Sequence, residues 1–218
     1  MAEHKIKQPE MSRQAHWQEV YRDKSEQQTS WFRPHLDASL RWIDSLELPP
    51  DAPLIDVGGG RSTLVDDLLD RSFTDVTVLD LSDAALAQSR LRLGDQAASV
   101  HWLAGEITEV ELPTAHYVLW HDRAVFHFLV EHDTQQRYVI SAARSMRDGG
   151  YMVLATFAED GPERCSGLPV ARYGADLLAA RFAPHFECVE AGREVHRTPF
   201  DTEQPFTYVV LRRMAGSA

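Results

Sequence analysis

From residue 53 onward the chain alternates short apolar runs with amphipathic runs of helical length, and this order constrains the fold more than any other feature. The first five apolar runs read as strands, at 53–57, 75–81, 99–104, 115–120 and 150–158. Helical patterns occupy 62–71, 82–93, 133–148 and 174–184. Strands separated by helices predict right-handed crossovers and a parallel sheet. The last two strand-like runs, 185–197 and 205–213, are joined by a short loop, which predicts an antiparallel hairpin. The expected fold is therefore a three-layer, doubly wound α/β fold with a seven-stranded, mostly parallel sheet.

The length of the chain favours a single domain. Its 218 residues, 44% of them hydrophobic, can bury one sizeable core. Two amphipathic runs, 16–24 and 30–46, precede the first strand and read as short helices. We expect a flexible tail over 1–14, one domain over 15–214, and an N-terminal helical lid over 15–48.

The charge balance argues against nucleic acid as a partner. Acidic side chains outnumber basic ones by 33 to 22, a net charge of −11 that would repel polyphosphate. Two cysteines, Cys165 and Cys188, are too few for a disulfide framework or a four-cysteine zinc site, which predicts a cytoplasmic protein without a metal. We also expect no membrane span and no secretory signal, because no long apolar run occurs.

Three glycines follow the first predicted strand, in the stretch LIDVGGGRST at 54–63. A strand that ends in such a loop and opens a helix presents free backbone N–H groups to a ligand. Gly58 and Gly60 match the dinucleotide-binding pattern, but Thr63 stands where that pattern has its third glycine. The loop therefore predicts a ligand site and leaves a nicotinamide dinucleotide open as one alternative.

Acidic residues follow the next two predicted strands. Asp80 comes about 20 residues after the glycines, where a carboxylate can accept both hydroxyls of a ribose. Glu106 follows the third strand within LAGEIT, and a polar cluster follows the fourth within WHDRAVFHFL. The carboxyl ends of parallel strands meet at one edge of a sheet, so this spacing predicts an adenosine-type ligand.

With these motifs the sequence resembles the class I S-adenosylmethionine-dependent methyltransferases over residues 50–213, and the resemblance implies their Rossmann-like fold and cofactor. It places the methionine part of S-adenosylmethionine against the loop and the adenosine part against the acids and their neighbours. The residues implied as cofactor contacts are Asp56, Gly58, Gly59, Gly60, Asp80, Leu81, Glu106, Ile107 and Trp120. The family usually has aspartate where Glu106 stands.

Methyl transfer from a sulfonium mainly requires alignment of nucleophile, methyl group and sulfur, so few catalytic residues are expected. His121 and Asp122, at the end of the fourth strand, are the candidates for orienting or deprotonating the acceptor. For Asp122 the alternative is a helix cap. For His127, between two phenylalanines, a packed core position is the main interpretation.

The segment WHDRAVFHFL with the later QQRYV is similar to the thiopurine methyltransferase branch, and WQEVY with SWF resembles its substrate-facing lid. This similarity favours a small acceptor such as a thiol; a protein lysine acceptor and a non-catalytic S-adenosylmethionine-binding module are the alternatives. The irregular stretch 157–173 is expected to cap the acceptor pocket. Candidate acceptor residues are Trp31, Arg123, Cys165 and His196, with Tyr208 as a further pocket member and Trp17, Tyr21 and Phe32 closing over the sulfonium.

Overall fold

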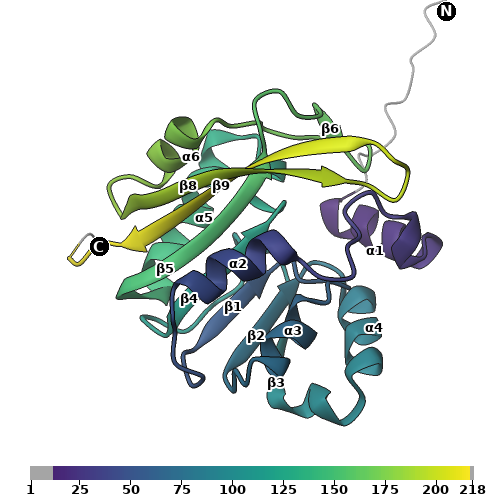
Figure 1. Ribbon diagram of the computed structural model, residues 1–218, viewed down its shortest axis with the longest axis horizontal. Helices are drawn as coiled ribbons and strands as arrows, with labels where there is room; N and C mark the ends of the chain where they lie inside the picture. The colour runs from purple at the N-terminus through teal and green to yellow at the C-terminus, as the bar shows by residue number, and fades with distance from the viewer. Residues whose placement is uncertain (1–11, 217–218) are drawn as a thin grey trace, which may run out of the picture.

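A seven-stranded sheet forms the centre of the computed structural model, which describes residues 12–216 (Figure 1). The strand order is β3-β2-β1-β4-β5-β9-β8. The first five strands pair in parallel, whereas β9 pairs antiparallel with β5 and β8. The strand bounds are β1 Leu54–Val57, β2 Val76–Asp80, β3 Val100–Ala104, β4 Tyr117–Arg123, β5 Met146–Phe157, β8 Phe186–Arg197 and β9 Glu203–Arg213. The predicted doubly wound sheet with a terminal hairpin is confirmed.

Helices cover both faces of this sheet and produce the three layers. Side chains of α2, α3 and α4 pack on one face, and side chains of α5 and α6 pack on the other. Alternation along each strand sends neighbouring residues to opposite faces. Accordingly, Leu54 belongs to the first core and Ile55 to the second. The helix bounds are α1 Arg13–Asp23, α2 Asp37–Ser45, α3 Leu64–Asp70, α4 Asp83–Leu93, α5 His132–Ser145 and α6 Ala175–Phe182, with short 3₁₀ turns at Glu26–Gln28, Gly94–Ser99 and Phe126–Phe128.

The N-terminal helices differ from the predicted lid. Ser12 caps α1 by accepting the backbone N–H of Ala15, so the helix begins inside the segment predicted to be a tail; residues 1–11 of that tail lie outside the described residues. The second predicted helix, 30–46, is helical only from Asp37, because Pro34 cannot donate the hydrogen bond a longer helix would need. Helix α2 packs on the sheet, so the covering segment is limited to α1 and residues 24–36.

Two boundaries around β5 also differ from the sequence expectation. The helix predicted to end at Gly149 and Gly150 ends at Ser145, and β5 begins at once with Met146. Met146 pairs with Tyr117 of β4, and a register shift follows it. Strand pairing therefore overrides the helical pattern, and the glycines lie within the strand.

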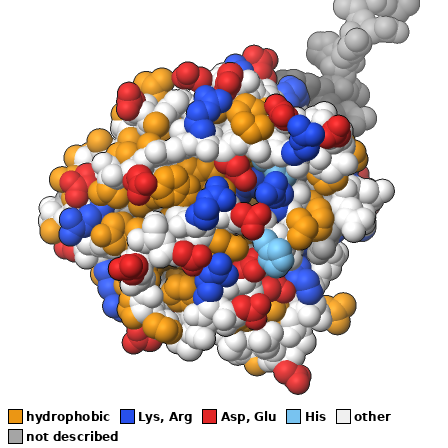
Figure 2. Space-filling model, viewed as in Figure 1, with side chains coloured by type: hydrophobic (Ala, Val, Ile, Leu, Met, Phe, Trp, Pro, Cys, Tyr) orange, Lys and Arg blue, Asp and Glu red, His pale blue; other side chains and the backbone are white. Residues whose placement is uncertain are grey.

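The segment after β5 is partly ordered by a small hairpin of β6 (Arg164–Cys165) and β7 (Leu168–Pro169). Acidic and basic side chains are interspersed on the molecular face in Figure 2, so the negative net charge is not gathered in one cluster there. Within residues 12–216, no helix combines the length and apolar character needed to cross a membrane.

Candidate functional site

A cavity lies at the carboxyl ends of the parallel strands, beneath the N-terminal segment. Strand order places the ends of β3, β2, β1 and β4 side by side along it. Its lining includes residues after each of these strands, residues of α1, and residues of the 29–36 segment. Among them are Gly58, Gly59, Asp80, Leu81, Glu106, Ile107, His121, Arg123, Trp31, Phe32 and Cys165.

The glycine loop at the end of β1 requires glycine for steric reasons. Gly58 has a φ of +74°, and a Cβ atom there would lie 2.0 Å from Cγ2 of Val125. A Cβ atom at Gly59 would lie 2.6 Å from Oδ2 of Asp56. The missing side chains therefore allow the loop to pass close to Val125, just after β4, and to the Asp56 carboxylate.

Asp80 ends β2 and is buried with its carboxylate at the cavity. Its Oδ1 accepts the backbone N–H of Ser82 at 2.7 Å. Burial raises the pKa of Asp80 to about 7, against the lowering effect of the Ser82 and Gly60 backbone N–H groups. A ligand that donates hydrogen bonds to this carboxylate would favour its ionised form.

Asp56 and His121, on the neighbouring strands β1 and β4, form a buried polar pair. Asp56 Oδ1 lies 2.7 Å from Nδ1 of His121, and Nε2 of His121 lies 2.8 Å from the Ser39 hydroxyl on α2. Both ring nitrogens of His121 are therefore engaged. Oδ2 of Asp56, in contrast, is buried without a hydrogen-bond partner although Asp56 lines the cavity.

Alternation along β4 separates the residues of its polar segment. His121 and Arg123 line the cavity, whereas Trp120 and Asp122 do not. Trp120 is fully buried on the α5 face and donates its indole N–H to the Tyr138 hydroxyl at 2.8 Å. Its expected cofactor contact is therefore not supported, because the strand turns this side chain into the opposite core.

Asp122 occupies the capping position that was the alternative to catalysis. Its carboxylate is fully buried and accepts the backbone N–H groups of Val125 and Phe126 and the Tyr138 hydroxyl. Burial raises the pKa of Asp122 to about 6, and these hydrogen bonds oppose the rise. The expected catalytic role of Asp122 conflicts with this placement, since its side chain does not reach the cavity.

The N-terminal segment roofs the cavity with aromatic side chains. The Trp17 ring centroid lies 5.7 Å from that of Trp31 and 5.2 Å from that of Phe128. Tyr21, also from α1, lines the cavity and contacts Trp31. The four aromatic residues predicted to close over the cofactor all line the cavity, namely Trp17, Tyr21, Trp31 and Phe32, and their contact with the cofactor stays a prediction.

Arg13 connects this roof to the third strand end. Its Nη2 lies 3.3 Å from Oε2 of Glu106, and both residues line the cavity. The sequence analysis missed Arg13, which falls in the polar stretch assigned to the tail. An arginine in the first turn of an N-terminal helix gives no signal without knowledge of which strand end it faces.

The remaining candidates divide between the cavity and the core. Cys165 lines the cavity, and burial raises the pKa of its thiol to about 11, so it is a neutral thiol near pH 7. His196 does not line the cavity: it is buried and its Nε2 donates to the Ser30 carbonyl at 2.7 Å. Tyr208 is also buried outside the lining, where it donates to Glu194. His127 is a core residue whose pKa burial lowers to about 3.

A family model described as a methyltransferase domain matches residues 54–150. This range contains the glycine loop, Asp80, Glu106 and the whole of β4. Residues 54–150 thus match a methyltransferase domain, and the fold around them is that of S-adenosylmethionine-dependent methyltransferases. S-adenosylmethionine is the cofactor of this domain.

Solved methyltransferase structures share the fold of this domain. An S-adenosylmethionine-dependent methyltransferase from Anabaena variabilis is 15% identical, with a TM-score of 0.70, over 98% of this chain and 100% of the other. The 1,6-didemethyltoxoflavin-N1-methyltransferase of Burkholderia thailandensis is 20% identical, with a TM-score of 0.67, over 89% and 81%. A structure concerned with conversion of a disulfide bond into a thioacetal group during echinomycin biosynthesis is 16% identical, with a TM-score of 0.76, over 93% and 92%.

Curated relatives are similarly distant in sequence and are much longer than this chain. The eEF1A lysine and N-terminal methyltransferase of Mus musculus is 19% identical over 150 residues, which are 66% of this chain. The protein of the same name from Bos taurus matches equally. The matched region spans only 21% of the length of these relatives.

The residues present fit S-adenosylmethionine. The carboxylate of Asp56, whose Oδ2 has no hydrogen-bond partner, suits the ammonium group of its methionine part, next to the glycine loop that lines the cavity. Asp80 would accept the ribose hydroxyls, while Leu81 and Ile107 would contact adenine. When bound, this cofactor supplies a methyl group activated by a positively charged sulfur.

Proposed function

We propose that this domain methylates a small acceptor molecule, with a thiol as the preferred nucleophile. The observation that carries the proposal is the aromatic roof formed by Trp17, Trp31 and Phe128 over the cavity. A roofed, largely apolar cavity suits a small molecule that can be enclosed. The aromatic faces also suit the sulfonium of the cofactor.

The acceptor would occupy the cavity beyond the glycine loop, toward β4 and β5. The cofactor contacts lie along β3, β2 and β1, which leaves the β4 end of the cavity for the acceptor. Arg123, Cys165 and Leu36 are among the lining residues that are not needed for the cofactor. We assign these residues to acceptor binding and exclusion of water.

Neither His121 nor Asp122, the two residues predicted as bases, is available to deprotonate the acceptor, which supports a thiol. Both ring nitrogens of His121 already make hydrogen bonds, and Asp122 faces the opposite core. Thiols ionise near pH 8.5, so a few per cent of a small thiol is already the nucleophilic thiolate at pH 7 without a protein base, far more than for an alcohol. In this proposal His121 orients Asp56 and takes no proton from the acceptor.

A protein lysine acceptor is the second candidate, supported by the names of the curated relatives. Arg123 lines the cavity without an ion pair to any carboxylate of residues 12–216, whereas the lining arginines Arg13 and Arg33 pair with Glu106 and Asp37. An incoming ammonium group would meet the like charge of Arg123, which raises the free energy of its complex. The charge of this region therefore favours a neutral or anionic acceptor.

The test is a matched panel of acceptors with release of S-adenosylhomocysteine as the readout. Benzenethiol, phenol, aniline and a lysine-containing peptide are supplied to the full chain with S-adenosylmethionine, and Gly58→Val serves as the cofactor-binding control. We expect benzenethiol to be turned over fastest and the peptide to stay at the background of the control. Turnover of the peptide alone would refute the proposal, and cofactor binding without turnover of any acceptor would favour a non-catalytic binding module.

A further inference from the structure

Arg123 is a charged residue at the acceptor end of the cavity whose charge has no internal partner. It is the last residue of β4 and pairs with Ala155 of β5, so it lies on the side of the glycine loop away from β2 and β3. Its guanidinium carbon lies 4.4 Å from the centroid of the Phe206 ring. This stacking holds the guanidinium against the wall of the cavity that it lines.

One nitrogen of this guanidinium is buried without a partner. Nη2 of Arg123 makes no hydrogen bond, and Arg123 forms no ion pair with a carboxylate of residues 12–216. An arginine stays protonated at any physiological pH. Arg123 is partly buried, so its charge is incompletely solvated, and an anionic ligand would compensate it.

The titratable groups that respond to the charge of Arg123 are mostly neutral near pH 7. Burial raises the pKa of Cys165 and Tyr208, and it lowers the pKa of His127 and His196. Glu194, a carboxylate that acts on both Tyr208 and His196, accepts the Tyr208 hydroxyl at 3.2 Å, and no ion pair joins it to Arg123.

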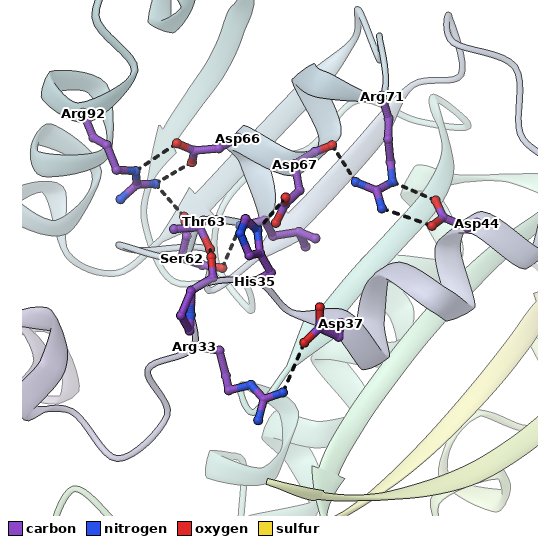
Figure 3. Close-up of polar contacts among 12 residues, drawn as sticks. Arg33, His35, Asp37, Asp44, Ser62, Thr63, Asp66, Asp67, Arg71 and Arg92 are labelled. Atoms are coloured by element: carbon purple, nitrogen blue, oxygen red, sulfur yellow. Dashed lines mark hydrogen bonds and ion pairs between the residues drawn. The ribbon is translucent and has the colours of Figure 1, made fainter. Parts of the chain in front are cut away.

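The other arginines at the cavity have partners in the chain. Arg13 pairs with Glu106, as described above. Arg33 is turned toward Asp37, with Nη2 3.2 Å from Oδ2 (Figure 3). Arg33 thus offers a matched control, because it is a cationic lining residue whose charge is already compensated.

We propose that Arg123 binds a carboxylate of the acceptor, so that this domain selects small acceptors that carry a negative charge. The proposal rests on the proposed small-molecule function and names its substrate class. The planar guanidinium matches the geometry of a carboxylate, and a carboxylate in the cavity would supply the counter-charge that residues 12–216 do not provide.

The experiment compares benzoate with benzamide, which have the same shape and differ in charge. Each is titrated by calorimetry into the full chain saturated with S-adenosylhomocysteine. We expect benzoate to bind the wild type at least about 10-fold more tightly than benzamide, as charge-assisted hydrogen bonds allow. Arg123→Gln removes this preference, Arg33→Gln retains it, and Arg123→Lys retains part of it.

A second measurement does not depend on the variants. Benzoate inhibits methylation of benzenethiol by the wild type, competitively against the thiol and not against S-adenosylmethionine. Equal binding of benzoate and benzamide, no binding of either, or a preference that survives in Arg123→Gln overturns the proposal. If benzenethiol is methylated but benzoate is not preferred over benzamide, only the carboxylate-binding role of Arg123 is refuted. If benzoate is preferred but no small acceptor is methylated, the proposed function is refuted.

Discussion

The affinity of this domain for S-adenosylhomocysteine is expected to depend on pH through Asp80. Burial raises the pKa of this carboxyl group to about 7 in the unliganded protein. If ribose hydroxyls donate to the ionised carboxylate, the ligand binds the deprotonated form and lowers the pKa in the complex. Affinity is then weak below pH 7 and rises as pH increases through 7, with release of a proton on binding.

The magnitude follows from the ionised fraction of Asp80. With a pKa of about 7, that fraction is roughly 0.1 at pH 6 and roughly 0.9 at pH 8, so the dissociation constant should fall about 10-fold between these values. Calorimetry at pH 6, 7 and 8, in buffers of different ionisation enthalpy, measures both the affinity and the proton release.

Asp80→Asn should remove the pH dependence of binding. Asp122→Asn is the matched control, because Asp122 is also buried with a raised pKa of about 6 but lies outside the cavity, so its substitution should leave the dependence intact. A dissociation constant that is the same at pH 6 and pH 8, or a dependence that persists in Asp80→Asn, would refute the ribose assignment.

The raised pKa of Asp80 also predicts how the stability of the unliganded protein changes with pH, which tests the direction of the pKa shift without a ligand. The folded pKa of Asp80 lies above the value of about 3.9 in an unfolded chain. Asp80 therefore makes the unliganded protein less stable as pH rises through 7, whereas Asp80→Asn does not share this loss. Urea unfolding of both proteins across pH 5 to 8 measures the difference.

Three further predictions concern the loop, the cap and the roof of the cavity. Gly58→Val should abolish binding of S-adenosylhomocysteine while the circular dichroism spectrum stays close to wild type, since the new side chain meets Val125 at a φ of +74°; a globally unfolded variant would make the glycine structural. Asp122→Ala should lower the free energy of unfolding by about 2–4 kcal/mol, because two backbone N–H groups and the Tyr138 hydroxyl lose their acceptor, and should leave cofactor affinity within about two-fold in calorimetry; lost affinity would contradict its placement. Arg13→Ala should weaken cofactor binding by no more than about five-fold, since an ion pair of this exposure contributes less than about 1 kcal/mol, and a larger loss would show that Arg13 contacts the cofactor directly.

Features that repeat along the chain could be predicted without the structure. The alternation of apolar and amphipathic runs predicts the parallel sheet, because the side-chain repeats of about 2 residues in a strand and about 3.6 in a helix are local properties of the backbone. The cofactor half of the cavity could be predicted for a related reason. Gly58, Asp80 and Glu106 follow successive strands, and the carboxyl ends of parallel strands share one edge.

Boundaries were less predictable where strand pairing competes with local pattern. Residues 146–148 continue a helical pattern, yet Met146 pairs with Tyr117 and starts β5. Pro34 is a visible helix breaker in the sequence, but the amphipathic spacing around it still predicted a helix from residue 30. At Met146 the competing interaction is a non-local strand pairing, and at Pro34 it is the steric effect of a single residue.

The acceptor half of the cavity was decided by the tertiary structure. The sequence specifies that neighbours on β4 face opposite sides, but not which of them meets the cavity and which meets α5. The fold turns Arg123 toward the cavity and Asp122 toward Tyr138, so the residue expected to act in catalysis caps a turn instead. Likewise, Arg13 meets Glu106 across more than 90 residues of chain, a contact that depends on where α1 lies over the sheet. The local sequence thus determines the periodicity of each helix and strand. Which residues of a strand face the cavity, and which charges pair, depends instead on the packing of distant elements.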